Sequence, residues 1–491
     1  MRDSILLIAA ALLAFGLSLG GSFHFDDYSL FENPNLTSLT ATRPLSNLTF
    51  RLNEFAGGQN PIGYHVVNLL LHIASVLLLR STLARVLPPQ TAWIAALIFA
   101  VHPIQTEPVN YVFERGTLLA TLLCIASLRT WLDGKLWIAV AWFAAALLAK
   151  EECVAFPVFL LLLHFSGSRS RAEFGAIGAM LALCVAAGLR VIAATAQVSG
   201  TATGFGAHVT PLEYLSMQGI AILRYTQLLV IPWGISIDPE LPLAALWLRL
   251  AAWLVIAVAA AFALRFFSKL QPGFWLLGAL VLLLPSSSIF PVDDLAADRR
   301  MYLPMIAISA GLALLAMRLP RHLVTGVLIV FALISLRYSY VWQTEQRLWT
   351  EAVAWAPHKA RPRLQLARAA DSPAAALQIL SEAQSIAPAD PGIASEQGRM
   401  LLSLGRPAEA LSAFGRALAL APEDATNISN RAAALLVLGQ SDTARQEFER
   451  ALHKDPCQFN ARVNLKRIGA AAPPIPPTCR YTPEQDSQLN P

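Results

Sequence analysis

Four short polar clusters interrupt the apolar first two thirds of this 491-residue chain, and the first contains a pair of acids. It reads FHFDDY and carries Asp26 and Asp27 directly after an apolar run. A carboxylate beside a second acid has a tunable pKa, which suits a general base. Asp26 would then accept a proton, and Asp27 would orient or bind a substrate. Alternatively, the two acids simply end an apolar helix at the level of the lipid headgroups.

The second cluster is TRPLSNLTFRLNEFAGGQNPIGYHVVNLLLH, a loop leading into the second apolar run, in which His65, Asn68 and His72 recur at helical spacing. One face of an otherwise apolar helix is therefore polar. Substrate contact and helix packing through hydrogen bonds both explain this face.

The third cluster, FAVHPIQTEPVNYVFERG, carries His102, Glu107 and Arg115 around two prolines. An acid, a base and a cation on a constrained loop suit a polar ligand, whereas the alternative is a solvated turn between helices. A further cluster at the membrane edge, LLAKEECVAFP, contributes Lys150, Glu151 and Glu152. These charges can neutralise one another or a ligand.

The fourth cluster, PSSSIFPVDDLAADRRMYLP, ends in Arg299, Arg300 and Tyr302. A guanidinium matches phosphate oxygens in a bidentate fashion, so Arg299 beside Tyr302 can grip a lipid-linked phosphate. Arg300 can play that part instead. Either arginine can also be an ordinary interfacial anchor.

The composition places these clusters in a membrane protein. Hydrophobic residues make up 55% of the chain and charged residues 14%, against about 45–50% and about 25% in soluble domains. This excludes an ordinary cytosolic enzyme, a disulfide-rich secreted module and a disordered chain. The net charge of +5 comes from short clusters of Lys and Arg between apolar runs, which is typical of membrane orientation rather than of a nucleic-acid-binding face.

Twelve apolar runs of about 15 to 22 residues predict a polytopic helical domain over residues 1–342. The first run resembles a signal peptide but lacks an A-x-A-like cleavage site, so we interpret it as an uncleaved membrane helix. Basic loops alternate with acidic or mixed loops if the run at 213–232 is re-entrant, which leaves about 11 crossings. The amino terminus would then be cytoplasmic, and the polar clusters and the carboxyl-terminal region would be extracytoplasmic.

A 34-residue period appears after the last apolar run and predicts an α-solenoid of about three tetratricopeptide repeats over residues 343–470. Pairs of residues separated by 34 positions include Gly405 and Gly439, and Phe414 and Phe448. Small residues allow close helix approach, and Phe fills the core between repeats. The Pro-rich tail at 471–491 is expected to be irregular.

The five cysteines show no metal-ligand spacing. Cys124, Cys153 and Cys184 lie in or beside apolar runs and are expected to be packing residues. Cys457 and Cys479 lie outside the membrane part, where an oxidising compartment would let them pair and pin the tail to the last repeat. Two free thiols are the alternative.

Taken in order, FDDY, RPLSNLTFRLN, NPIGYHVVNLLLH, FAVHPIQTEPVNYVFERGTLLA, KEECVAFPVFLLLL and DRRMYLP, followed by the repeats, resemble the TMTC family. This is a family of membrane O-mannosyltransferases of the GT-C superfamily, with relatives among bacterial TPR membrane proteins. The resemblance implies an all-α GT-C-type membrane domain, a bacterial inner membrane, a polyprenyl-phosphate-linked sugar donor and an acceptor approached from the exported side. By motif position it assigns Asp26 and Asp27 to the family's acidic pair, Glu107 to its second acid and Arg299 to its arginine.

Two departures accompany the resemblance. The last motif reads Asp298-Arg299-Arg300, whereas the family usually has an acid before one arginine, and the family's repeat arrays are usually longer. The carboxylates would also suit a hard divalent cation, but no complete ligand set is readable, and no redox cofactor is needed.

The leading hypothesis is an inverting glycosyltransferase that transfers a sugar, mannose by resemblance, to Ser or Thr of exported proteins held by the repeats. The same fold can instead transfer sugar to a glycan or a lipid. A hypothesis of another class is a non-catalytic scaffold that assembles envelope proteins. A simple anchor would need one helix and no acids at several helix ends, which favours the enzyme.

Overall fold

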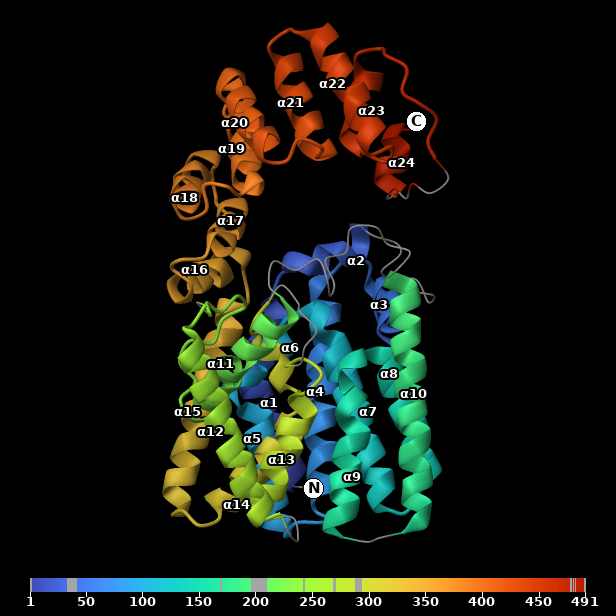
Figure 1. Cartoon of the computed structure of the whole chain (residues 1–491), viewed down its shortest axis with the longest axis vertical. Helices are drawn as coiled ribbons and strands as arrows, with labels where there is room; N and C mark the ends of the chain where they lie inside the picture. The colour runs from blue at the N-terminus through green and yellow to red at the C-terminus, as the bar shows by residue number, and fades with distance from the viewer. Residues whose placement is uncertain are drawn as a thin grey trace. The chain divides into compact units, whose positions relative to one another are not determined.

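The computed structural model describes residues 2–32, 42–167, 170–195, 210–241, 243–267, 271–287, 294–476, 479, 481 and 483–489. Every regular element in these residues is a helix, as predicted. The chain divides into two compact units (Figure 1). The first ends at Thr344, and the second comprises Glu345–Pro491 together with the short helix α2 (Ser29–Glu32).

The first unit is a bundle of apolar helices (Figure 1). Short 3-10 turns at Phe25–Tyr28, Val112–Glu114, Glu151–Ala155 and Asp298–Met301 carry polar residues between the helices. The α-helices of this unit are α1 (Arg2–Phe15), α3 (Pro44–Gly57), α4 (Pro61–Leu83), α5 (Pro89–Val101), α6 (Thr106–Asn110), α7 (Arg115–Leu132), α8 (Leu136–Ala149), α9 (Phe156–Ser166), α10 (Arg171–Thr195), α11 (Pro211–Val230), α12 (Leu246–Arg265), α13 (Pro272–Leu283), α14 (Met305–Ala316) and α15 (Arg321–Val341).

Fewer helices are long enough to cross a membrane than the predicted 11. Among the described residues, five are long and apolar enough, and a sixth arises if the bent pair Pro103–Asn110 and Val112–Leu132 forms one span. Several predicted crossings are short helices, such as α13 and α14 with 12 residues each. At 1.5 Å per residue such a helix covers about 18 Å of a hydrocarbon core about 30 Å thick. Hydropathy of a run does not reveal where a helix breaks within it.

The predicted re-entrant run forms α11, which is not among the candidate spans. Its polar residues include Arg224, which pairs with Asp298, and Gln218, whose side-chain amide donates to the Leu295 carbonyl oxygen at 3.1 Å. α11 therefore packs its polar groups against the loop that carries the fourth cluster.

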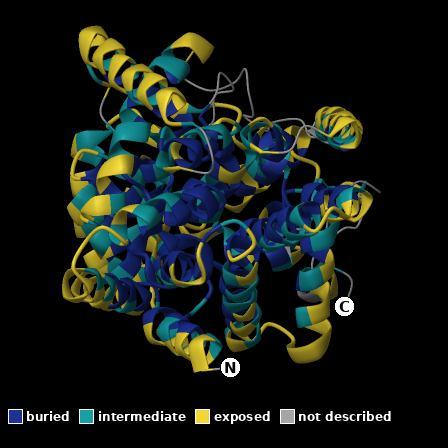
Figure 2. Cartoon of the chain, turned by 90° about the horizontal axis from the view of Figure 1, so that it is seen from below, coloured by how far each residue is buried: buried dark blue, intermediate teal, exposed yellow. Residues whose placement is uncertain are grey.

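The outer helices are the least buried within the protein, as Figure 2 shows for the chain viewed from below. Only 11% of the apolar window of α12 and 17% of that of α10 is buried, against 44% for α4. Apolar side chains that remain exposed on long helices are expected to face lipid. These helices support the interpretation of the first unit as a membrane domain.

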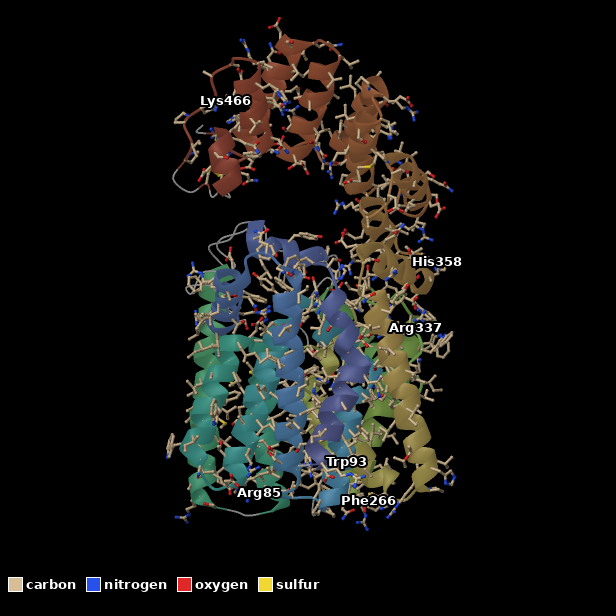
Figure 3. All side chains as sticks on the ribbon, turned by 180° about the vertical axis from the view of Figure 1, so that it is seen from behind. Arg85, Trp93, Phe266, Arg337, His358 and Lys466 are labelled. Carbon is tan, nitrogen blue, oxygen red and sulfur yellow. A yellow bond between two sulfur atoms is a disulfide. The ribbon has the colours of Figure 1, made fainter. Side chains whose placement is uncertain are left out.

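The polar turns and the basic loops lie at opposite ends of the bundle. One end carries Arg85 and Phe266, and Arg337 lies toward the other (Figure 3). Near Arg85, Arg129 pairs with Asp133 through its Nε atom at 3.0 Å. The polar 3-10 turns lie at the end of the bundle opposite to Arg85 and Arg129. That end holds the candidate site.

The second unit consists of antiparallel helix pairs. Gly405 and Gly439 join the helices of two pairs with φ values of 70° and 78°, a conformation that favours glycine. A Cβ atom at Gly398 would lie 2.5 Å from Phe414 Cε1, so the repeat also needs glycine where its helices meet. The helices are α16 (Glu345–Trp355), α17 (Ala360–Arg368), α18 (Pro373–Ile386), α19 (Pro391–Ser403), α20 (Pro407–Leu420), α21 (Ala425–Val437), α22 (Ser441–Lys454), α23 (Phe459–Arg467) and α24 (Pro483–Leu489).

The tail differs in part from the expected irregular segment, because it ends in helix α24. Cys457 and Cys479 form a disulfide, which is the pairing that the sequence suggested. It closes a sequence separation of 22 residues and fastens the tail beside α23. Cys124 and Cys153 are buried free thiols, in agreement with a packing role.

Candidate active site

Asp26 lies half-buried in the turn Phe25–Tyr28, just beyond α1. Its backbone N–H donates to the Tyr111 hydroxyl at 3.0 Å. The preceding Phe25 has φ 43°, a left-handed conformation that is unusual for a bulky residue and often marks a functional turn. Burial raises the pKa of Asp26 by disfavouring the charged carboxylate, although the Tyr111 hydroxyl and the Arg299 cation oppose this. A carboxylate with a raised pKa is suited to proton transfer.

Asp27 is fully buried and holds two loops together. Its Oδ2 atom accepts the backbone N–H of His24 at 2.9 Å, and its Oδ1 atom accepts that of Phe113 at 2.7 Å. Burial raises the pKa of Asp27 well above its usual value, and the two backbone donors partly counter this. Since both oxygens are engaged, Asp27 positions its neighbour Asp26 against the third cluster.

Arg299 is the centre of an ion network that joins the third and fourth clusters. Its Nη1 atom lies 2.7 Å from Glu107 Oε1, and its backbone N–H donates to Glu107 Oε2 at 2.9 Å. Its Nε atom lies 3.3 Å from Glu114 Oε1, and its Nη2 atom lies 3.1 Å from Asp294 Oδ2. All three nitrogens of the guanidinium thus face carboxylates, while 24% of the Arg299 side chain stays exposed.

Lys150 extends the network to the membrane-edge cluster. Its Nζ atom lies 2.8 Å from Glu114 Oε2 and 2.7 Å from Thr117 Oγ1, and 3.4 Å from Glu152 Oε1. The side chains of Lys150 and Glu114 are only 5% and 6% exposed. Glu114 thus bridges two cations, and the site depends on this buried pair for its shape.

Glu151 pairs elsewhere. It binds Arg43 in a bidentate fashion, with distances of 2.5 Å from Nη2 to Oε1 and 2.9 Å from Nε to Oε2. Burial disfavours the charged form of Glu151, but the Arg43 guanidinium outweighs it and lowers the pKa to about 2. Both side chains are about one third exposed, so this pair lies at the rim of the site.

Arg115 is engaged by the protein rather than open to a ligand. It is fully buried and donates to the side chains of Asn68 at 2.9 Å and Asn53 at 2.6 Å, and to two backbone carbonyl oxygens. Its Cζ atom lies 4.4 Å from the centroid of the Phe50 ring. These contacts give Arg115 a structural part, fastening α3 and α4 to the start of α7.

The histidines and Tyr302 also have partners inside the bundle. His102 caps the turn after α5 and contacts the Leu229 carbonyl oxygen at 3.1 Å. The buried Tyr302 hydroxyl lies 2.9 Å from His72 Nδ1, and His65 Nε2 lies 3.4 Å from the Ser22 carbonyl oxygen. None of these contacts joins the Arg299 network directly.

The two other charged residues of the last motif brace its loop. Arg300 donates to the Asp294 carbonyl oxygen at 2.7 Å and to that of Leu295 at 3.3 Å. Asp298 is buried, pairs with Arg224 and accepts the backbone N–H of Ser236 at 3.3 Å. Residues 288–293 of the fourth cluster lie outside the described residues.

Sequence reasoning missed several residues that build this site. Glu114 had a readable signal, since it is a second acid within the same polar cluster as Glu107. Four other missed residues lie within the quoted motifs and clusters without having been singled out: Arg43, Tyr111, Thr117 and Asp294. Arg224 lies outside them and carried no local signal. Within the described residues, no group of three or more His, Cys, Asp or Glu side chains could hold a metal ion.

Comparisons with known proteins agree with the motifs and the repeats. A tetratricopeptide repeat family model matches residues 401–464. Protein O-mannosyl-transferase TMTC4 of Mus musculus is 26% identical over 70% of this chain and 57% of its own length. TMTC1 of Homo sapiens is 36% identical over 24% of this chain and 16% of its own length. The chain is thus similar to the TMTC proteins and carries tetratricopeptide repeats.

This TMTC-like chain spans a little over half the length of TMTC4. Among solved structures it aligns with ArnT from Cupriavidus metallidurans bound to undecaprenyl phosphate, at 13% identity and a TM-score of 0.39. That alignment covers 86% of this chain and 80% of ArnT.

Proposed function

We propose that this chain is an integral-membrane glycosyltransferase of the GT-C type. It would take mannose from a polyprenyl phosphate and transfer it with inversion to Ser or Thr of exported proteins. The observation that carries this proposal is the convergence of Asp26, Glu107, Lys150 and Arg299 from four polar segments at one end of an apolar bundle. The similarity to proteins named O-mannosyl-transferases supports the sugar and the acceptor.

In this mechanism the Asp26 carboxylate removes the proton of the acceptor hydroxyl. At the same time the oxygen of that hydroxyl attacks the anomeric carbon of the donor sugar. The bond between that carbon and the phosphate oxygen breaks, and the phosphate leaves with the electron pair. The transition state has oxocarbenium character, as in glycoside hydrolysis. Asp27 and Tyr111 hold Asp26 in place through the loop backbone.

Arg299 would stabilise the leaving phosphate. The network around it contains two cations, Arg299 and Lys150, and four carboxylates, Glu107, Glu114, Glu152 and Asp294. The phosphate would therefore have to replace one of these carboxylates as a partner of the guanidinium.

Tetratricopeptide repeats bind peptides on their concave face, so the second unit would hold the acceptor polypeptide.

The direct test is mass spectrometry of exported proteins from cells with and without this chain. We expect a hexose on defined Ser or Thr residues that disappears with the protein. A hexose lost from a glycan or a lipid instead would assign the other acceptor. If no glycosylation changes and envelope assemblies fall apart, the protein is a scaffold.

Replacing Arg299 should weaken donor binding. A hydrogen bond to a charged group contributes about 1.5–3 kcal/mol, so Arg299→Ala should raise the KM for the lipid-linked donor roughly ten- to hundredfold. Arg299→Lys keeps the charge and should lose less. If Arg300→Ala raises this KM and Arg299→Ala does not, Arg300 is the phosphate ligand.

The topology has its own test. The alternation of basic loops predicts a cytoplasmic amino terminus in a bacterial inner membrane, with the site and the repeats outside the cytoplasm. A reporter that works only in the cytoplasm, fused at Gly469, should therefore be inactive, and an export-dependent reporter at the same position should be active. The reverse pattern would put the acid network on the cytoplasmic side.

A further inference from the structure

A long groove lies between α12, α13 and α14, away from the acid network. Its volume is about 710 Å³, and its lining is mainly apolar. The apolar lining includes Leu229, Trp275 and Ala307. The polar residues of the lining include Arg265, Gln271 and Arg318. α12 is the least buried of the candidate spans, so the groove opens toward the surface that faces lipid.

The groove is about as long as one leaflet is thick. Ala307 and Arg318 are eleven residues apart along α14 and the turn after it. At 1.5 Å per residue this is about 16 Å, and half of the hydrocarbon core is about 15 Å. An acyl chain of one leaflet would fit along it.

The polar residues gather at one end. Arg265 ends α12, Gln271 precedes α13 and Arg318 follows α14, so all three lie where these helices turn. Figure 3 places Phe266, the neighbour of Arg265, at the end of the bundle that also carries Arg85. Arg265 and Arg318 are exposed, and neither forms an ion pair with another described residue.

We infer that this groove binds one anionic phospholipid, with its phosphate at Arg265 and Arg318 and an acyl chain along the apolar lining. Two guanidinium groups that form no ion pair with a described residue lie beside an apolar channel. They complement a molecule that is negatively charged at one end and apolar over the rest. The occupant must also reach the groove from the hydrocarbon, which a phospholipid does. The sugar donor of the proposed function would need its phosphate at Arg299 instead.

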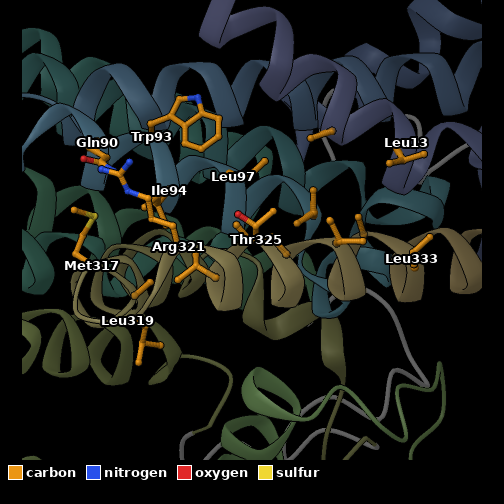
Figure 4. A pocket seen from close by; sticks show the side chains of 17 residues that line it. Leu13, Gln90, Trp93, Ile94, Leu97, Met317, Leu319, Arg321, Thr325 and Leu333 are labelled. Atoms are coloured by element: carbon orange, nitrogen blue, oxygen red, sulfur yellow. The ribbon is translucent and has the colours of Figure 1, made fainter.

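A second groove provides an internal comparison. It lies between α1, α5 and α15, has a volume of about 530 Å³ and is lined by Trp93, Gln90 and Arg321 (Figure 4). Arg321 is the only arginine among its lining residues, whereas the first groove has two. Arg321→Gln is therefore a matched control, because it removes a cation near the same end of the bundle but outside the proposed site.

The test is native mass spectrometry of the full chain in mild detergent, titrated with phosphatidylglycerol or with phosphatidylcholine of the same acyl chains. We expect one phosphatidylglycerol to be retained at a lower concentration than phosphatidylcholine. Each basic residue near an anionic lipid contributes about fivefold, so Arg265→Gln with Arg318→Gln should weaken retention about 25-fold. The corresponding pair of Lys substitutions should retain most of the preference, and Arg321→Gln should leave it unchanged.

Equal retention of the two lipids by the unmodified chain would overturn the inference, whether or not the variants fold. An equal loss in Arg321→Gln would also overturn it, because the effect would then come from the general surface charge. A third arm uses undecaprenyl phosphate as competitor. If undecaprenyl phosphate displaces phosphatidylglycerol at a concentration below the one at which phosphatidylglycerol binds, the groove prefers a polyprenyl lipid. That result would overturn the assignment to a phospholipid.

Discussion

Asp26→Asn should lower the rate of sugar transfer by about 10²–10⁴-fold, which is the usual contribution of a general base. Asparagine keeps the size of the side chain and some of its hydrogen-bonding capacity, but it cannot accept the proton. The fold should survive, because the backbone N–H of Asp26 still donates to the Tyr111 hydroxyl and the asparagine carbonyl oxygen can still accept a hydrogen bond from it. Transfer of labelled sugar to an acceptor peptide, or complementation of a deletion, measures the effect.

A matched control is Asp133→Asn, which removes a carboxylate from the surface pair with Arg129 at the opposite end of the bundle. It should leave transfer unchanged. Asp27→Asn is less clean, since both oxygens of Asp27 accept backbone N–H bonds and an amide can replace only one of them. Each variant must first reach the membrane at normal abundance. Parental activity in Asp26→Asn and in Asp27→Asn, separately and together, would refute this site and favour a scaffold.

The direction of the Asp26 pKa adds a pH dependence to the same prediction. Burial raises this pKa above its usual value, so the base is lost to protonation at a higher pH than for a solvated aspartate. Transfer should therefore fall as the pH decreases through that raised pKa. A rate that stays flat down to the ordinary range of an aspartate, near pH 4, would show that Asp26 is not the base.

The second large effect concerns stability. Glu114→Gln should destabilise the membrane domain by about 3–5 kcal/mol, because it leaves the buried Lys150 ammonium without its closest carboxylate. Removing one partner of a buried pair costs more than the pair itself contributes. The thermal midpoint of unfolding in detergent micelles measures the loss.

The double variant Glu114→Gln with Lys150→Met should regain much of this loss, since no buried charge is then left unpaired. Asp133→Asn again serves as control, because its pair with Arg129 lies at the surface and should contribute little. A double variant as unstable as the single one would show that Glu114 stabilises the bundle through Arg299 or Thr117 rather than through Lys150.

Much of the architecture could be predicted because it depends on local patterns. Apolar runs indicate helices in lipid wherever they lie in the chain. The spacing of Gly405 and Gly439 indicates a repeat, since each repeat reuses the same turn. The family resemblance rests on the order of short motifs from FDDY to DRRMYLP, each of which is a local stretch of the chain.

The number of crossings could not be predicted in the same way. A run of suitable length and hydropathy can be one straight helix or a helix that breaks, and the bent pair at Pro103–Asn110 and Val112–Leu132 turns by 96° within such a segment. Packing against neighbouring helices decides where the break falls, because buried backbone groups must find partners there.

The sequence by itself determined that acids and cations occur at several helix ends, and it identified Asp26, Glu107, Lys150 and Arg299 among them. Only the tertiary structure decided which charges meet. Arg299 donates a hydrogen bond to Glu107, which lies 192 residues away in the sequence. Glu151 forms an ion pair with Arg43, and Arg115 donates to Asn68 within the protein. The reason is that an ion pair needs its atoms within a few ångströms, and only the packing of the helices decides which loops come that close.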